Sequence, residues 1–185
     1  MIFTETKLKG ALVLELEKLE DERGFFARTW CKHEFTKHGL NPSLAQCSVS
    51  FNHKRGTLRG MHYQIAPHQE AKLVRCTAGA IYDVIIDLRH DSPTFTQWIA
   101  IELTAGNRRV LYVPENFAHG FQTLEDNTEV FYQMSEFYDP ESARGIRWDD
   151  PAFGIQWPPA DRLISARDAT YPNFNHCHLT QDQKE

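Results

Sequence analysis

Short strand patterns at close spacing constrain this chain more than any other feature of its sequence. Apolar, β-branched and aromatic residues dominate four runs that are bounded by Gly, Pro, Asp or Asn, at 11–19, 80–89, 108–114 and 128–138. Many short strands with few helical patterns between them are typical of a β-sandwich or a barrel. We therefore predict an all-β fold.

Only a few segments depart from the strand pattern. Residues 29–39 read as a helix that ends at Gly39, and another short helix is expected after Pro159. Residues 139–159 are broken by Gly, Pro and Asp but carry several large apolar side chains, so we expect an ordered loop. The polar tail 173–185 lacks periodicity, and most of it is expected to fray.

Length and charge limit the possible functions. A chain of 185 residues with 41% hydrophobic content suits one domain, here assigned to residues 1–172. The net charge of −5 provides no basic field for a nucleic-acid partner. The four cysteines form no CxxC pair, and no apolar run approaches the length of a membrane span or resembles a signal peptide. We expect a cytoplasmic protein with no nucleic-acid or membrane partner.

The stretch GTLRGMHYQ, residues 56–64, contains residues that packing alone would not select in a strand. Side chains alternate between the two faces of a strand, so Arg59 and His62 would point in opposite directions. They converge on one ligand only if the strand is bent or bulged, which Gly60 permits. The alternative is a structural histidine with one hydrogen-bond partner beside a solvated arginine.

Four further residues stand in apolar or glycine-bounded sequence: Lys72, His119, Tyr132 and Asp168. Each also has a structural interpretation, because a lysine extends its amine to solvent, a buried histidine or tyrosine needs only one partner, and an aspartate commonly caps a helix or turn.

A metal site is the second interpretation of the histidines. His62, His119 and Glu70 could supply two imidazoles and a carboxylate on a β-scaffold. The MHYQ run offers one imidazole rather than a closely spaced pair, and Lys72 follows Glu70 closely, which is unfavourable beside a cation. The histidines of the tail, in NHCH, are a weaker metal signal. We therefore predict no metal site.

Ordered motifs across the chain resemble the dTDP-4-dehydrorhamnose 3,5-epimerase family, cupin-like enzymes that act on nucleotide-linked 4-keto-6-deoxyhexoses. The resemblance runs from about Gly10 to about Pro172 and rests on DERGFFART, QCSVSFNHKRGTLRGMHYQ, EAKLVRCTAGAIYDVIIDLR, YVPENFAHGFQTLED, FYQMSEFYDP and GIRWDDPAFGIQWP. It implies a jelly-roll β-sandwich, a homodimer in which an N-terminal strand crosses to the partner, and catalysis without a cofactor.

The resemblance also implies roles for individual residues. His62 matches the general base, Asp168 its paired carboxylate, Tyr132 the residue that returns a proton from the other face of the sugar, and Lys72 the cation beside the keto oxygen. The implied contacts with the nucleotide-diphosphate sugar are Arg23, Phe26, Gln46, Ser48, Arg59, His119, Tyr138 and Arg167.

The chemistry explains these residue types. A ketone at C4 acidifies the hydrogens at C3 and C5, and a cation near O4 stabilises the enolate that forms on deprotonation. An imidazole ordinarily titrates near neutral pH, and a carboxylate fixes its tautomer, which suits a general base. Inversion then requires a proton donor on the opposite face, which a tyrosine provides.

Four residues depart from the family pattern. Arg28 stands where an acidic residue is common, Ser48 where asparagine is usual, Ala143 where glutamate is usual, and Arg167 in place of a lysine. We therefore hypothesise a weaker preference for dTDP than is usual in the family.

Three alternatives stay open from the sequence. The enzyme could epimerise one carbon only, or it could use a different nucleotide sugar. A protein of another class, a non-catalytic sugar-nucleotide-binding or metal-binding cupin, would be expected to lose Tyr132 or Asp168, and both are present.

Overall fold

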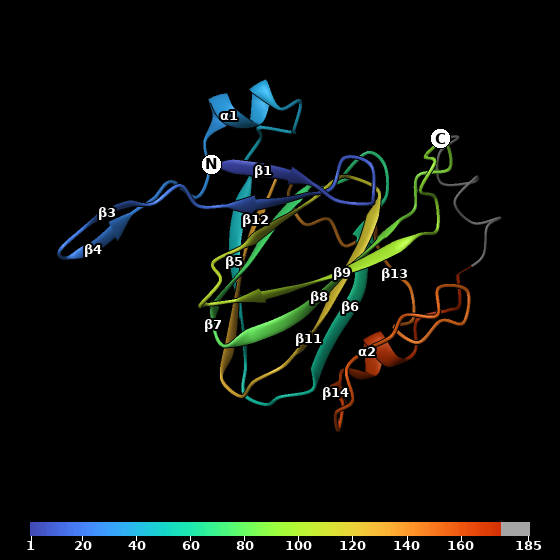
Figure 1. Ribbon diagram of the computed structural model, residues 1–185. Coiled ribbons are helices and arrows are strands. Elements are labelled where there is room, and N and C mark those ends of the chain that lie inside the picture. Colours follow the sequence, from blue (N-terminus) through green and yellow to red (C-terminus); the bar gives the residue numbers. More distant parts are fainter. Residues whose placement is uncertain (175–185) are drawn as a thin grey trace.

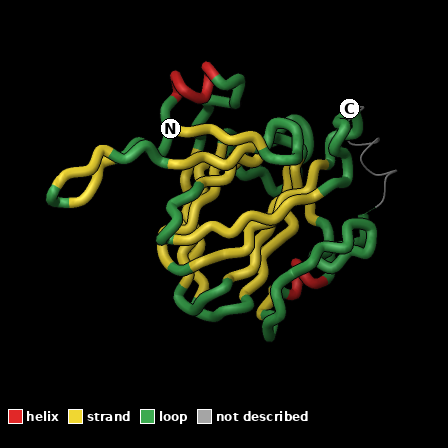
Figure 2. The backbone as a smooth tube through the Cα atoms, viewed as in Figure 1, coloured by secondary structure: helices red, strands yellow, loops and turns green. Residues whose placement is uncertain are grey.

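The computed structural model describes residues 1–174, and strands form most of its regular structure (Figures 1 and 2). The first sheet has six strands, in the spatial order β1 (Ile2–Glu5), β2 (Leu12–Glu15), β10 (Val110–Val113), β7 (Lys72–Ala78), β12 (Thr128–Met134) and β5 (Gln46–Asn52). Neighbouring strands in this sheet are antiparallel.

The second sheet packs against the first. Its strands follow the order β13 (Ala143–Gly145), β6 (Thr57–Gln64), β11 (Phe117–Thr123), β8 (Ala80–Asp87) and β9 (Trp98–Thr104), and β14 (Leu163–Ile164) pairs with β6 in parallel. The two packed sheets confirm the predicted all-β jelly-roll sandwich.

The helices are short. α1 (Lys32–Lys37) lies inside the predicted segment 29–39. The short helix expected after Pro159 is present, but the chain first forms β14, where the Leu163 amide donates to the Gly56 carbonyl. α2 (Ala166–Ala169) follows β14 and begins after Ser165, whose side chain accepts a hydrogen bond from the Asp168 amide.

Apolar side chains pack in three clusters. The central cluster lies between the sheets and includes Val74, Ile85 and Phe121. On the outer face of the first sheet, Phe35 of α1 and neighbouring residues cover β2, β7 and β10. This cover does not extend to β5, the edge strand, where Val49 remains 56% exposed.

The segment 139–159, predicted to be an ordered loop, covers the second sheet. Ile146, Phe153 and Trp157 are buried against the outer face of that sheet, as expected for an ordered loop. The segment also contains β13, a strand that its broken sequence did not predict. Phe174 packs near Phe153, and the rest of the tail lies outside the described residues.

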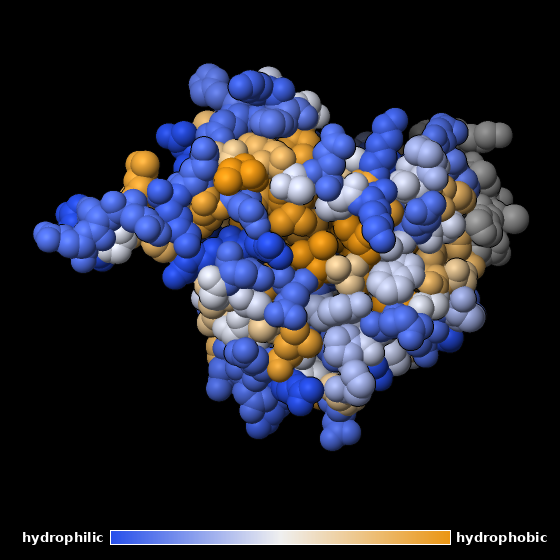
Figure 3. Space-filling view, in the orientation of Figure 1, coloured by the Kyte–Doolittle hydropathy of each residue, from blue (hydrophilic) through white to orange (hydrophobic). Residues whose placement is uncertain are grey.

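A hairpin projects from the body of the domain. It consists of β3 (Leu19–Asp21) and β4 (Gly24–Phe26), and its large apolar side chains Leu19, Phe25 and Phe26 are exposed. Figure 3 shows it as a narrow arm, with hydrophobic residues gathered on the body between α1 and β9. Within residues 1–174, no helix has the length and hydropathy needed to cross a membrane.

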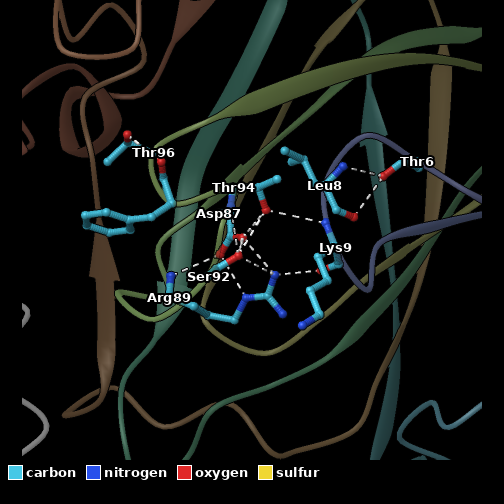
Figure 4. Close-up of polar contacts among 9 residues, drawn as sticks. Thr6, Leu8, Lys9, Asp87, Arg89, Ser92, Thr94 and Thr96 are labelled. Atoms are coloured by element: carbon cyan, nitrogen blue, oxygen red, sulfur yellow. Dashed lines mark hydrogen bonds and ion pairs between the residues drawn. The ribbon is translucent and has the colours of Figure 1, made fainter.

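A buried carboxylate joins the β8–β9 connection to the turn between β1 and β2 (Figure 4). Asp87 accepts hydrogen bonds from the Arg89 guanidinium, from Ser92 Oγ at 2.5 Å and from Thr94 Oγ1 at 2.7 Å. Arg89 then donates to the Lys9 carbonyl at 2.6 Å. This network closes one end of the sandwich.

Candidate active site

A cavity of about 370 Å³ lies where strands of both sheets meet the segment 138–144 and α2. It is lined by Gln46, Ser48, His62, Tyr63, Gln64, Glu70, Lys72, Tyr132, Met134, Tyr138, Ala143, Arg144 and Arg167. Seven of the predicted site residues line it. The first and last of them, Gln46 and Arg167, are more than 100 positions apart in sequence, and the fold brings all seven to one hollow. Asp168 lies directly behind His62.

His62 and Asp168 form a hydrogen-bonded pair at this cavity. His62 Nε2 lies 2.8 Å from Asp168 Oδ1, and the His62 side chain is 43% exposed whereas that of Asp168 is 7% exposed. Burial opposes ionisation of Asp168, but its hydrogen bonds with His62, Gly60 and Ser165 outweigh this and lower its pKa. An ionised carboxylate only accepts hydrogen bonds, so Nε2 carries a proton, and in the neutral imidazole the lone pair is on Nδ1.

The backbone of β6 is irregular beside this pair. The pairing of β6 with β11 shifts register between His119 and Phe121, which is the kind of irregularity that Gly60 was expected to permit. Gly60 has φ +131°, and a Cβ at this position would lie 2.5 Å from Gly120 Cα. Glycine is therefore required here, and the bend lets the Gly60 amide donate to Asp168 Oδ2 at 3.2 Å.

The Lys72 ammonium is held at the cavity wall by an ion pair. Its Nζ lies 2.9 Å from Glu70 Oε1, with both side chains 10% exposed, and it also donates to the His62 carbonyl at 3.4 Å. Glu70 thus partners a cation. Within residues 1–174, no group of three or more His, Cys, Asp or Glu side chains is arranged to hold a metal ion.

Tyr132 lies on β12, in the sheet opposite to the one that carries His62. Burial raises the pKa of its hydroxyl, and the nearby Asp83 adds to this while Arg59 opposes it, so Tyr132 stays protonated at neutral pH. His119 packs edge-on against the Tyr132 ring at 6.0 Å and bonds to Asp83 at 2.7 Å. His119 therefore supports Tyr132 from behind rather than lining the cavity.

Arg59 also lies beside the cavity rather than in its lining. Its Nε donates to Asn52 Oδ1 at 2.8 Å, and its side chain is exposed. The Arg59 guanidinium lies close enough to Tyr132 to oppose the rise in the pKa of the Tyr132 hydroxyl.

Polar and aromatic residues form one end of the cavity. Gln46 Oε1 accepts from the Tyr138 amide at 3.3 Å, and Tyr138 is 53% exposed. Arg167 lies beside the Tyr138 hydroxyl, whose hydrogen bond contributes most to raising the pKa of this guanidinium. Ser48 and Ala143, two of the departures from the family pattern, line the cavity as well.

Three residues with predicted or hypothesised roles at the nucleotide lie away from this cavity. Arg23 and Phe26 are on the projecting hairpin, where Arg23 pairs with Asp21 at 2.5 Å. Arg28 pairs instead with Glu34 of α1 at 3.2 Å. The cavity of a single chain therefore lacks these side chains.

Sequence reasoning missed some residues of the site. Arg144, Tyr63 and Met134 line the cavity, and the Tyr171 ring packs edge-on against the His62 ring. The alternation of β6 and β12 could have indicated Gln64 and Met134, which share the faces of His62 and Tyr132. No local signal marks Tyr171, because its position depends on the docking of α2.

Comparison with known proteins agrees with this geometry. The family model described as dTDP-4-dehydrorhamnose 3,5-epimerase matches residues 5–176. A protein of that name from Salmonella typhimurium is 39% identical over 183 residues, which cover 98% of this chain and 100% of the relative.

Two solved structures are also similar. The Bacillus anthracis dTDP-4-dehydrorhamnose 3,5-epimerase with TDP and PPi bound is 40% identical, has a TM-score of 0.89, and the match covers 94% of this chain and 99% of that one. ChmJ, a 3'-monoepimerase from Streptomyces bikiniensis in complex with dTDP-quinovose, is 31% identical with a TM-score of 0.84, and the match covers 92% and 86% of the two chains.

Proposed function

The chain belongs to the dTDP-4-dehydrorhamnose 3,5-epimerase family and is an isomerase-class enzyme of deoxysugar biosynthesis, and we propose that the cavity at His62 is its active site. The substrate is a nucleotide-linked 4-keto-6-deoxyhexose, which is epimerised at C3 and C5. The observation that carries the site assignment is a half-exposed imidazole, fixed by a buried carboxylate, in a cavity that also holds an ammonium and a protonated phenol.

His62 acts as the base in this proposal. Its Nε2 is bound to Asp168, so Nδ1 removes the proton from the carbon next to the ketone. The electron pair moves onto O4, and the imidazolium that forms is stabilised by the Asp168 carboxylate. After His62 releases its proton to solvent and Tyr132 takes one up, the same residues act at the other carbon.

Lys72 stabilises the negative charge that develops on O4. Its ammonium is anchored by Glu70 and by the His62 carbonyl, so it is already oriented before the reaction starts. Removing one such preorganised donor typically costs roughly 10²–10³-fold in turnover.

Tyr132 supplies the proton to the opposite face of the enolate. It comes from the sheet opposite to that of His62, and its raised pKa keeps the proton available. Inversion requires this separation, because a proton returned by His62 would regenerate the original configuration.

The nucleotide binds at the end of the cavity formed by Gln46, Ser48, Tyr138 and Arg167. Arg167 is suited to the diphosphate, and Tyr138 offers a ring on which a base stacks. Arg59 lies near Tyr132 and adds a second guanidinium for the phosphates.

We also propose that the functional unit is a homodimer. Apolar side chains of β5 are exposed on an edge strand, which is unfavourable in an isolated domain, and the hairpin exposes Leu19 and Phe26. A second copy would cover these residues and receive Arg23 and Phe26 in its own cavity.

Mixing two inactive variants tests this arrangement. His62→Ala disables the cavity and Arg23→Ala disables the hairpin, so a mixed dimer contains one intact site and regains activity. Mixtures that stay inactive after verified subunit exchange would place both residues in the same chain's site. Sedimentation measurements on the wild-type protein check the dimer independently.

The free thiols of Cys31, Cys47 and Cys76 suit a reducing compartment, so we propose that the protein is cytoplasmic. We further propose that residues 1–172 form a single domain, whose cavity is completed by the hairpin of the partner subunit.

Product analysis tests the reaction itself. NMR of the sugar formed from dTDP-4-keto-6-deoxyglucose should show inversion at both C3 and C5. The monoepimerase structure shares this fold, so inversion at C3 alone is the second candidate, and the same spectrum distinguishes the two.

Binding of TDP, UDP, CDP and GDP tests the nucleotide. Ser48 and Ala143 lie in the cavity and support an altered preference, whereas Arg28 does not line it. Ser48→Asn should strengthen the preference for TDP, and Arg28→Glu serves as the comparison. A preference for TDP of about a hundredfold in the wild type, roughly 2.7 kcal/mol, would overturn the altered-preference hypothesis.

A further inference from the structure

The segment that carries Asp168 also places an aromatic ring against His62. The Tyr171 and His62 ring centroids are 5.9 Å apart, with an interplanar angle of 72°. Asp168 holds one edge of the same imidazole through Nε2. One short stretch of chain thus contacts the imidazole twice, through the Asp168 hydrogen bond and through the Tyr171 ring. The hydrogen bond alone would let the imidazole rotate about it.

Tyr171 is itself fixed by the backbone of β13. A Cβ added at Gly145 would meet the Tyr171 ring carbons at 2.2–2.5 Å, so the ring occupies the space above this glycine. Gly145 pairs with His62 in the sheet, which brings the ring and the imidazole together. The Arg167 guanidinium also packs over the Tyr171 ring, with its central carbon 5.7 Å from the ring centroid.

Local folding explains why the segment reaches this point. β14 pairs with β6 at Thr57 and Leu58, and the Ser165 side chain then caps α2. Asp168 consequently meets β6, and Tyr171 follows one turn later at Gly145. Burial raises the pKa of the Tyr171 hydroxyl, so the ring stays uncharged beside the Asp168 carboxylate.

We infer that Tyr171 is a positioning residue for His62: its ring, seated on Gly145, fixes the plane of the imidazole so that Nδ1 faces the cavity. This role rests on the proposed function, in which His62 is the base. It requires the aromatic ring and does not require the hydroxyl.

Ring removal should lower turnover more than substrate affinity. Tyr171→Ala is expected to reduce kcat by roughly 10²-fold with little change in KM, since small misplacement of a catalytic group has effects of this size. Tyr171→Phe retains the ring and should recover most of that loss. A Phe variant as impaired as the Ala variant would contradict the inference.

Gly145→Ala provides an independent test in the same space. The added methyl collides with the Tyr171 ring, so this variant should lose turnover, and Tyr171→Ala should add little further loss when combined with it. Independent, multiplicative losses would show that the two positions do not act through one contact.

A direct measurement separates this inference from the proposed function. ¹⁵N and nuclear Overhauser NMR of the substrate-free protein should show one His62 ring orientation in the wild type and in Tyr171→Phe, and averaging in Tyr171→Ala. Unchanged His62 signals in a folded Tyr171→Ala protein would overturn the positioning role, whether or not His62 proves to be the base.

Discussion

Asp87 and Asp168 are both buried carboxylates whose pKa is lowered, yet their surroundings differ. Asp87 is fully buried, and its oxygens are bonded to Arg89, Ser92 and Thr94 (Figure 4). Asp168 instead bonds an imidazole that opens into a cavity. Burial of a carboxylate therefore does not identify an active site. The informative property is whether its partner retains a reactive atom that faces open space.

This comparison predicts the largest effect on turnover at Asp168. Asp168→Asn should reduce turnover by roughly 10²–10⁴-fold, because an amide no longer selects the His62 tautomer with a free Nδ1. Steady-state kinetics measure the loss, and Asp87→Asn is the matched control. Comparable loss of turnover per folded molecule in both variants would remove the distinction between the two carboxylates.

Whereas the loss of turnover should be largest for Asp168, the loss of stability should be largest for Asp87. Asp87→Asn breaks an ion pair with Arg89, whose side chain is 28% exposed, and should lower the free energy of unfolding by roughly 3 kcal/mol, as for a largely buried pair. Urea denaturation measures this change. A variant as stable as wild type would show that the network in Figure 4 does not secure this end of the sandwich.

Tyr132→Phe tests the proposed proton donor, which lies on the sheet opposite to that of His62. Deprotonation by His62 remains possible in this variant, so solvent exchange at C3 or C5 should exceed inversion. The ratio of exchange to inversion, followed by NMR in D₂O, is the measured quantity. Equal losses of exchange and inversion would argue against Tyr132 as the proton donor.

The smallest expected effect is that of acid, which should reduce the contribution of both carboxylates to the free energy of unfolding. Burial opposes ionisation of each, but hydrogen bonds to Arg89 in one case and His62 in the other lower both pKa values. A lowered folded-state pKa gives stability that is complete above the unfolded value of about 3.9 and is lost as pH falls through the folded value.

The stability gap between wild type and Asp87→Asn should therefore narrow from pH 7 to pH 3, and the gap for Asp168→Asn should narrow over the same range. Urea midpoints at several pH values measure both. A gap that widens on acidification would reverse the sign of this linkage.

Sequence patterns predicted the sandwich because the apolar, β-branched and aromatic composition of β2, β8, β10 and β12 is a local property that packing preserves. They also identified Gly60 as the residue that would permit a bend in this strand, since glycine in a strand is itself a local signal, and the register of β6 and β11 does shift there.

Contacts made by the docking of distant segments were harder to predict. Asp168 lies 106 positions from His62. The sequence marked it as a candidate residue, but its pairing with His62 was expected only from the family resemblance. Tyr171 had no such support, since its contact depends on how β14 and α2 dock. The position of the hairpin away from its own chain's cavity likewise has no local signal in the sequence.

The central claim is that His62 removes protons from C3 and C5 and that solvent-derived protons replace them. Turnover in D₂O tests it most directly. Wild type should yield product with deuterium at both C3 and C5, and His62→Ala should incorporate none at either carbon. Inverted product without solvent deuterium, or continued exchange in a folded His62→Ala protein, would contradict the account.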